Sequence, residues 1–295
     1  MKKKILIIVG DNLGLKRDQI DYEDLEIVKF PTIVDGKEYR ESEEHDANWL
    51  ISKFERENIV AKSSTLPQKD IVEIIEKNHS KFDLIIHVVM SSGLSAASFK
   101  VAENIRKQYE NIIPIINVDS RQTVCGVANV VLGIIDLIKE NDDLSIEELT
   151  RLCQEVVEKT YSYFILPDLS YLYKGGRIGK AQSLMGSVLH IIPIVGAMGD
   201  NEDGIIVPCG KGRTFKQVND QVIELIKEKM KEKSVEKIRR AIVLYGYGDS
   251  NQEAIADFVE KAKSLPTQDF IIGKPGLVDT VYIGPGGYLI SVYLK

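Results

Sequence analysis

The sequence predicts an α/β protein of two domains: a doubly wound parallel sheet first, then an α+β domain with a mixed or antiparallel sheet. The chain has 295 residues, and at about 150 residues per domain that length favours two domains. Strand-like and helix-like segments alternate in the first half, whereas Gly and Pro become frequent in the second. We expect the domains at residues 1–160 and 161–295, closely packed around a cleft.

Three runs of aliphatic residues in the first half are typical of strands that are buried on both faces of a parallel sheet. The runs are Ile5 to Val9, Leu84 to Met90 and Ile112 to Val118. Helical patterns lie between and after them, at Asp70 to Lys77, Leu94 to Tyr109 and Thr123 to Lys139. The alternation predicts βαβ units and therefore a doubly wound sheet.

The second half combines helices with short strands. Ser145 and Glu148 have the spacing of a capping box, which predicts a helix from Ser145 to about Phe164. Further strands are expected at Gly204 to Val207, Ala241 to Tyr245, Phe270 to Ile272 and Tyr288 to Leu294. Two long helices are expected at Lys216 to Lys231 and Asn251 to Leu265. Short strands separated by turns favour an α+β domain.

Charge and cysteine content exclude several classes of protein. The chain has 38 basic and 44 acidic residues, hence a net charge of −6, which disfavours nucleic acid or an anionic membrane as partner. The cysteines Cys125, Cys153 and Cys209 show no CxxC spacing, and the histidines form no HExxH pattern. No apolar stretch is long enough to span a bilayer. We expect a cytoplasmic protein without metal, cofactor or stable membrane insertion.

Hydroxyl side chains gather at two expected helix starts. The segment Ser91-Ser92-Gly93-Leu94-Ser95 follows a strand, where ligands of doubly wound sheets bind, and helix N-termini favour anions. The segment Ser63-Ser64-Thr65 precedes another helix. Each segment has a plainer interpretation, because one serine can cap the first helix and Thr65 with Gln68 can form a capping box at the second.

Basic residues lie beside glycines in two further segments. Tyr171 to Lys180 contains Gly175-Gly176 next to Arg177, and Lys211-Gly212-Arg213 reads as a basic turn. Such segments bind anions or are simple solvated turns. Gly284 to Gly287 reads as a tight turn. No GxGxxG, Walker or GxSxG motif is present, so the residues give no reason to assign NAD binding or a catalytic nucleophile.

Taken together, these segments resemble the DegV family of bacterial fatty-acid-binding proteins, which act as acyl carriers for a fatty-acid kinase. Tyr171 to Ile178 matches the family's Y-L-x-K-G-G-R-I without a change, and Asp119-Ser120 matches its D-S. Weaker matches follow the family order and spacing over the whole chain. They are Gly10-Asp11-Asn12 for T-D-S, Lys62 to Leu66 for K-T-S-Q-P, Ser91 to Ala96 for S-S-x-L-S-G, Lys211 to Arg213 for R-G-R and Tyr282 to Gly286 for H-x-G-P-G.

The resemblance implies a carrier, not an enzyme, which binds a long-chain fatty acid such as palmitate in an apolar tunnel between the domains. It implies that Ser63 and Ser95 hold the carboxylate, with Ser64, Ser91 and Tyr282 beside them. It also implies that basic residues serve acyl-phosphate formation with the kinase; these are Arg177, Lys211 and Arg213. Burial of a C16 tail would contribute on the order of 11 kcal/mol before ordering costs, at roughly 0.8 kcal/mol per CH₂.

The chain departs from the family pattern at three positions. Tyr282 replaces the family's His, Ile192 stands where many relatives carry Lys, and Lys211 replaces an Arg. A phenol hydrogen-bonds a carboxylate but carries no positive charge. Two alternatives stay open: an enzyme or binding protein for a small phosphorylated or carboxylated substrate held by Arg177, Lys211 and Arg213, and a divergent member that binds a different hydrophobic acid.

Overall fold

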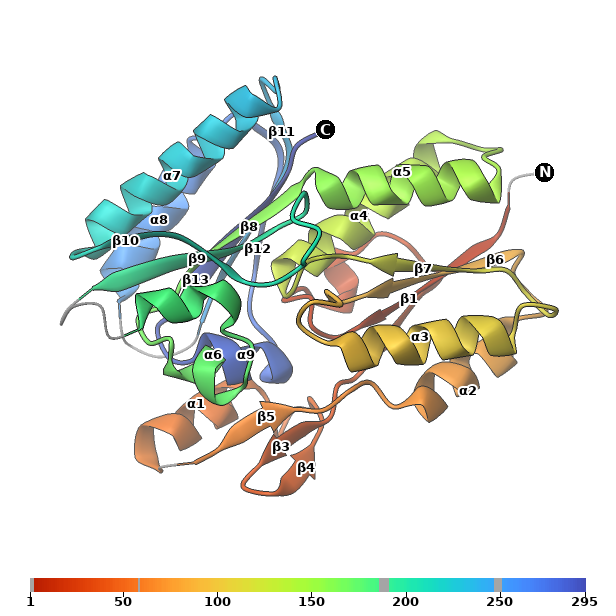
Figure 1. Cartoon of the computed structure of the whole chain (residues 1–295), viewed down its shortest axis with the longest axis horizontal. Coiled ribbons are helices and arrows are strands. Elements are labelled where there is room, and N and C mark those ends of the chain that lie inside the picture. The colour runs from red at the N-terminus through yellow and green to blue at the C-terminus, as the bar shows by residue number, and fades with distance from the viewer. Residues whose placement is uncertain (1–2, 58, 186–190, 247–250) are drawn as a thin grey trace.

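A computed structural model describes residues 3–57, 59–185, 191–246 and 251–295 of the chain. Two large sheets lie side by side, and a small three-stranded sheet lies below them in the view of Figure 1.

The first sheet is parallel throughout and has the order β2-β1-β6-β7. Its strands are β1 (Ile5–Gly10), β2 (Leu25–Val28), β6 (Leu84–Val89) and β7 (Ile115–Asp119). One face packs against α2 (Gln68–Asn78) and α3 (Ala96–Gln108), and the other against α4 (Cys125–Glu140) and α5 (Ile146–Glu158). The predicted doubly wound parallel sheet is confirmed.

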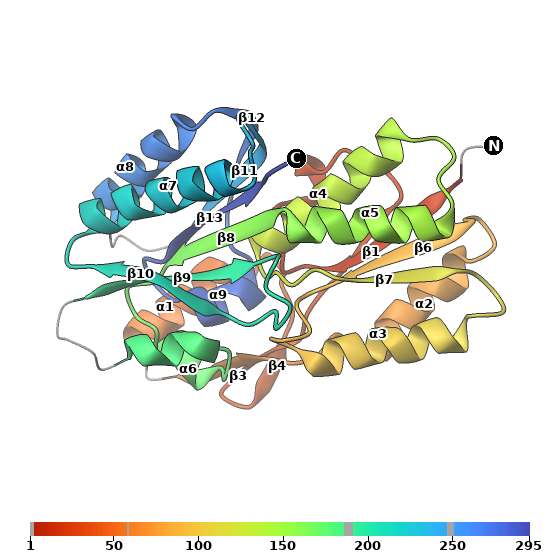
Figure 2. The ribbon, with the colours of Figure 1, turned by 45° about the horizontal axis from the view of Figure 1, so that its top comes forward.

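The second sheet has the order β10-β9-β8-β13-β11-β12 and is antiparallel except for the pair β11 and β12. Its strands are β8 (Thr160–Ile165), β9 (Ile192–Met198), β10 (Val207–Gly212), β11 (Ile238–Tyr245), β12 (Thr267–Gly273) and β13 (Tyr288–Tyr293). Its outer face is covered by α7 (Phe215–Glu232) and α8 (Gln252–Lys263), as Figure 2 shows. The predicted mixed sheet is confirmed.

Helix α4 belongs to the packing of both sheets. Its residues are buried almost all round, from Cys125 to Ile138, and they share one hydrophobic core with strands of both sheets. Asn129, in the middle of the helix, donates a hydrogen bond to the Ser291 hydroxyl of β13 over 2.9 Å. A continuously apolar helix is the sequence pattern of an element that is covered on every side. Helix α4 therefore joins the two sheets through one shared core.

The small sheet has the order β4-β3-β5 and joins distant parts of the chain. It consists of β3 (Thr32–Val34), β4 (Lys37–Tyr39) and β5 (Ala61–Ser63), and it packs with α1 (Ala47–Arg56) and α9 (Leu277–Ile283). Helix α9 comes from the end of the chain, whereas the sheet comes from its beginning. The division of the chain into domains at residue 160 stays a prediction.

Three short helical segments complete the described structure: η1 (Arg17–Gln19), α6 (Ser170–Lys174) and η2 (Gly179–Leu184). No helix in the described ranges combines the length and apolar character that a membrane crossing requires.

Two element predictions were wrong. The helix that starts at Ser145 does have the predicted capping box, but it ends at Glu158, and Thr160 to Ile165 form β8. The β-branched and aromatic residues of that segment fit a strand between two neighbours better than a helix. The strand expected at Gly204 to Val207 begins only at Val207 and continues to Gly212.

The helix start predicted after the segment Ser63-Ser64-Thr65 also needs correction. Helix α2 begins at Gln68 with Pro67 as its N-cap, and no side chain caps it, so the expected Thr65–Gln68 capping box is wrong. Ser63 does not lie at a helix start either, because it is the last residue of β5 and pairs with Thr32. Ser95 does occupy the N-cap of α3, although its hydroxyl makes no capping hydrogen bond.

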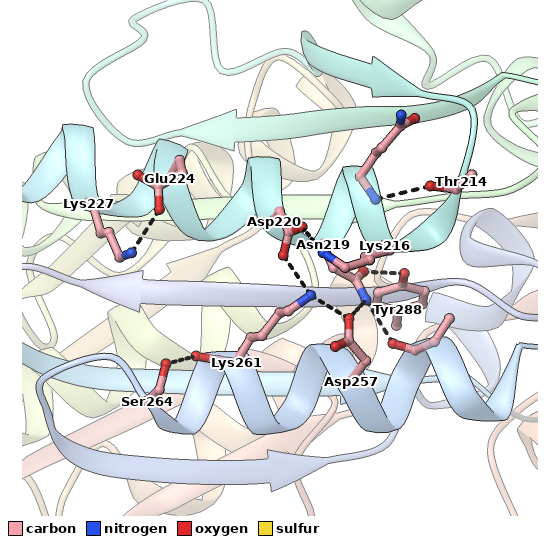
Figure 3. A network of polar contacts seen from close by, with 12 residues as sticks. Thr214, Lys216, Asn219, Asp220, Glu224, Lys227, Asp257, Lys261, Ser264 and Tyr288 are labelled. Carbon is pink, nitrogen blue, oxygen red and sulfur yellow. Dashed lines mark hydrogen bonds and ion pairs between the residues drawn. The ribbon is translucent and has the colours of Figure 1, made fainter.

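A polar network fastens the outer helices to the second sheet (Figure 3). The Tyr288 hydroxyl donates to Asn219 Oδ1 over 2.6 Å, and Asn219 Nδ2 donates to Asp257 Oδ2 over 2.8 Å. Lys261 bridges Asp220 and Asp257, with Nζ to oxygen distances of 2.6 and 2.7 Å. Because Tyr288 and Asn219 are buried and satisfied by one another, the network fixes α7 and α8 at the start of β13.

Candidate functional site

A narrow cavity lies between the two large sheets, and its free space is about 600 Å³, part of it open to solvent. The first sheet contributes residues that follow the carboxyl ends of its strands, Asn12 after β1 and Met90 after β6. Ligands of doubly wound sheets bind at this edge.

Apolar side chains from both large sheets and from α6 and α9 make up most of the cavity wall. They are Phe30, Met90, Leu94, Val124, Phe164, Leu166, Leu172, Val195, Ile206, Val278 and Ile283. The polar residues of the wall are Asn12, Ser63, Thr123, Arg177, Asp279 and Tyr282. An apolar slot with few polar groups suits a ligand that is largely hydrocarbon.

Ser63 and Tyr282 meet in this wall, although 219 residues separate them. The Ser63 and Tyr282 hydroxyl oxygens are 2.5 Å apart, and the Ser63 backbone N–H donates to the tyrosine oxygen over 3.4 Å. One hydroxyl hydrogen is used between the two oxygens, so the other is free to donate to a ligand. The contact exists because α9, which carries Tyr282, packs on β5, which ends at Ser63.

Arg177 brings a positive charge to the same place. Its guanidinium carbon lies 5.8 Å from the centroid of the Tyr282 ring, and its nitrogens donate to the Leu94 and Gly175 carbonyl oxygens over 3.3 and 2.7 Å. No acidic side chain forms an ion pair with it among the residues that the structure describes. A half-buried cation held by carbonyl groups and lacking a carboxylate partner favours an anionic ligand.

The glycine pair before Arg177 makes room for the tyrosine. A side chain at Gly175 would overlap the Tyr282 ring, and Gly176 has a φ of +71°, which glycine adopts without strain. Tyr171 to Lys180 was expected to be either an anion-binding segment or a simple turn. In the structure it places Arg177 beside Tyr282.

The other predicted serines are not among the residues that line the cavity. The Ser95 and Ser98 hydroxyl oxygens are 2.8 Å apart, which again leaves one hydroxyl hydrogen free. Ser91 is buried, and its hydroxyl donates to the Gly204 carbonyl oxygen. Ser64 is exposed, and its backbone N–H donates to the Pro31 carbonyl oxygen over 2.8 Å. Ligand contacts of Ser95, Ser91 and Ser64 stay predictions.

Lys211 and Arg213 are not part of the cavity wall. Both are exposed, and Lys211 pairs with Pro193 within the strands β10 and β9, so the expected basic turn is the end of a strand. The Arg213 backbone N–H donates to Gln217 Oε1 over 2.9 Å. Of the three predicted basic residues, Arg177 alone lines the cavity.

Three polar residues of the wall, Asn12, Thr123 and Asp279, were not predicted as site residues. Thr123 was expected only as the start of a helix. Asn12 belongs to a segment that was compared with the family's T-D-S, but it was assigned no role. Asp279 lies in α9, three residues before Tyr282, and nothing in the sequence predicted this short helix. Once the helix is known, the spacing places both side chains on one of its faces.

Asp279 belongs to a group of carboxyl groups with raised pKa values. Burial raises the pKa of Asp279 well above its usual range, and Asp11 and Glu41 raise it further. Burial, opposed by the hydrogen bond from the Phe30 N–H, raises the pKa of Asp11 to about 7, and burial also raises the pKa of Glu41. No group of three or more potential ligands among the described residues is placed to hold a metal ion.

Comparison with known proteins identifies the family. Residues 4–295 match the family model described as "Uncharacterised protein, DegV family". The chain belongs to the DegV family. A DegV domain-containing protein of Clostridium acetobutylicum is 30% identical over 287 residues, which are 96% of each chain. The resemblance inferred from the motifs is confirmed.

Solved structures of DegV proteins share the fold. The structure titled "Fatty Acid Binding of a DegV family Protein from Thermus thermophilus" has a TM-score of 0.86 at 22% identity and covers 99% of this chain and 100% of its own. DegV of Bacillus subtilis, titled "a fatty acid binding protein", has a TM-score of 0.82 at 24% identity, with coverage of 99% and 100%. At these identities the likeness confirms the two-sheet DegV fold.

Two departures from the DegV pattern can now be placed. Tyr282, at the position where the family pattern was expected to carry His, lies in the cavity wall against Ser63 and Arg177. Ile192 is the first residue of β9 and pairs with Gly212.

Proposed function

We propose that this DegV protein binds a long-chain fatty acid, with the carboxylate at Ser63, Tyr282 and Arg177 and the tail along the apolar wall. One observation carries the proposal: the wall of an apolar slot contains Arg177, which has no acidic partner among the described residues, and a hydroxyl group with a free hydrogen. Two DegV proteins with this fold are described as fatty-acid-binding, which supports the same ligand class here.

The polar residues at the carboxylate and the apolar wall along the tail contribute differently to binding. Burial of a C16 tail would contribute on the order of 11 kcal/mol before ordering costs, at roughly 0.8 kcal/mol per CH₂. A hydrogen bond to a charged group contributes about 1.5–3 kcal/mol. The tail therefore supplies most of the affinity, whereas the hydroxyls and Arg177 fix the position of the carboxylate.

We also propose that the protein is a carrier that presents its ligand to a fatty-acid kinase. Arg177 reaches the carboxylate end of the cavity, and the exposed Lys211 and Arg213 are free to meet phosphate groups of a partner. The polar residues of the wall form no nucleophile–base pair of a serine or cysteine enzyme, which supports a binding role.

Native mass spectrometry of the protein purified from bacteria tests the ligand class. We expect a co-purified acid of 14 to 18 carbons, which denaturation releases. An empty protein that binds small phosphorylated or carboxylated compounds instead of palmitate would contradict the proposal and favour an anion-binding enzyme.

Loss of a single hydroxyl is expected to weaken binding moderately. Ser63→Ala and Ser95→Ala should each reduce palmitate affinity by about 1–2 kcal/mol, the contribution of one hydrogen bond to a charged group. The double variant should lose less than the sum, because both hydroxyls would hold one carboxylate. Titration calorimetry on delipidated protein measures this. Ser264→Ala, at the end of α8 on the outer side of the second sheet, is the control (Figure 3). Unchanged affinity in both single variants would remove the carboxylate assignment.

Tyr282→His is expected to make binding depend on pH. A phenol carries no positive charge, so the parent protein gains no cation at residue 282 between pH 5.5 and 8. Asp11, with a pKa of about 7, ionises within this range in both proteins, so the difference between variant and parent is the quantity to compare. A histidine at residue 282, with an ordinary pKa near 6.5, would gain a charge at the acid end and bind the carboxylate several-fold more tightly. Calorimetric titrations across this range measure the effect. A lower melting temperature with the same pH profile as the parent protein would instead show that Tyr282 only packs beneath the Gly284–Pro285 turn.

A further inference from the structure

Asn12 is a buried side chain with an unused hydrogen-bond donor. It follows β1, is 4% exposed and lines the cavity between the sheets. Its Nδ2 group has no hydrogen-bond partner in the part of the chain that the structure describes. A buried donor without a partner is destabilising, so such groups are normally satisfied by water or by a ligand. The cavity is where a partner for Asn12 can lie.

Asp279 contributes a second polar group to the same wall. It is 2% exposed, and its Oδ2 accepts a hydrogen bond from the Gly276 N–H over 3.2 Å. The Gly14 N–H also bonds its carboxyl group, so Asp279 lies against the loop that carries Asn12. Burial, with the neighbouring Asp11 and Glu41, raises the pKa of the Asp279 carboxyl group well above its usual range. A carboxyl group accepts hydrogen bonds in either protonation state.

The cavity wall has two polar regions of opposite electrostatic character, one at Arg177 and one at Asp279. Arg177, beside Tyr282, is a cation without an acidic partner in the described structure, and it attracts a carboxylate. Asp279 lies near two further acidic side chains, Asp11 and Glu41, so an anionic group is disfavoured there. A ligand group at Asn12 and Asp279 has to be polar and uncharged.

We propose that Asn12 and Asp279 form a subsite for a hydroxyl group carried part-way along the acyl chain, so that the cavity favours hydroxylated fatty acids. A hydroxyl oxygen accepts from Asn12 Nδ2, and its hydrogen donates to the Asp279 carboxyl group. Asp279 precedes Tyr282 by three residues, about 4.5 Å of helix rise. The subsite therefore faces the half of the chain nearer to the carboxylate. This inference rests on the proposed fatty-acid binding.

Positional isomers of monohydroxy hexadecanoic acid test the subsite, because they differ only in where the hydroxyl lies. Calorimetry on delipidated protein should show that one isomer with its hydroxyl in the carboxyl-proximal half binds about tenfold more tightly than isomers hydroxylated near the methyl end. Asn12→Leu should abolish that difference between the isomers. Asn78→Leu makes the same exchange at the end of α2, outside the cavity wall, and should preserve the difference.

The outcomes separate this inference from the proposed function. If palmitate binds but all isomers bind alike, or if Asn12→Leu keeps the difference, the subsite is refuted and water occupies the place. If neither palmitate nor any isomer binds, the proposed function fails as well. Asn12→Ala removes the same donor and replaces Asn12→Leu if melting curves show that the leucine variant does not fold.

Discussion

Leu172→Trp is expected to reduce the affinity for palmitate by at least about a hundredfold. Leu172 lies in α6, is 6% exposed and lines the cavity between the sheets. An indole in its place would fill space that the tail needs. If about four CH₂ groups are kept from burial, the loss is roughly 3 kcal/mol at about 0.8 kcal/mol each, which is somewhat more than a hundredfold. Calorimetric titration of delipidated protein measures it.

Ligand length supplies the internal control for this variant. Octanoate leaves much of the slot empty, so its weaker binding should change far less in Leu172→Trp than that of palmitate. A melting temperature close to that of the parent protein shows that the larger side chain is accommodated. Undiminished palmitate affinity would mean that the tail does not occupy this cavity.

Local sequence patterns were sufficient for the large sheets. The aliphatic runs at Ile5 to Val9 and Leu84 to Met90 mark strands β1 and β6, because a strand covered by helices on both faces has no polar side to show. The capping box at Ser145 marks the start of α5, since the two bonds that define it are local. Its end was wrong because apolar residues continue into β8, and only the neighbouring strands β9 and β13 make that segment extended.

The small sheet could not be predicted, because its strands are three residues long and its core is completed by α9 from the other end of the chain. The polar part of the cavity wall could not be predicted for the same reason, because it also depends on the packing of α9. Ser63 and Tyr282 meet only after α9 has packed on β5, and no spacing in the sequence encodes that contact. Arg177 was found through a motif, whereas Asn12 was not assigned a role because its unpaired amide is visible only in the folded cavity wall.

Asp11→Asn is expected to stabilise the protein at pH 8 and to have little effect at pH 4. Burial and the nearby Glu41 raise the pKa of Asp11 to about 7 in the folded protein, above the unfolded value of about 3.9. The folded state therefore binds the proton more tightly. The stability linked to this group is complete below pH 4 and is lost as the pH rises to 7. Asparagine is uncharged at every pH and avoids that loss.

The expected gain at pH 8 is about 2 kcal/mol. The pKa difference sets an upper limit on the order of 4 kcal/mol, and Asp11 is partly exposed at a surface pocket, which reduces it. Asparagine retains the Oδ1 atom that accepts from the Phe30 N–H over 2.9 Å, so the loop geometry should persist. Thermal unfolding at both pH values measures the effect. Asp18→Asn, at an exposed position in η1, makes the same charge change and should shift the melting temperature little. An equal gain for Asp11→Asn at pH 4 and pH 8 would refute the linkage and point to a loop effect that is independent of charge.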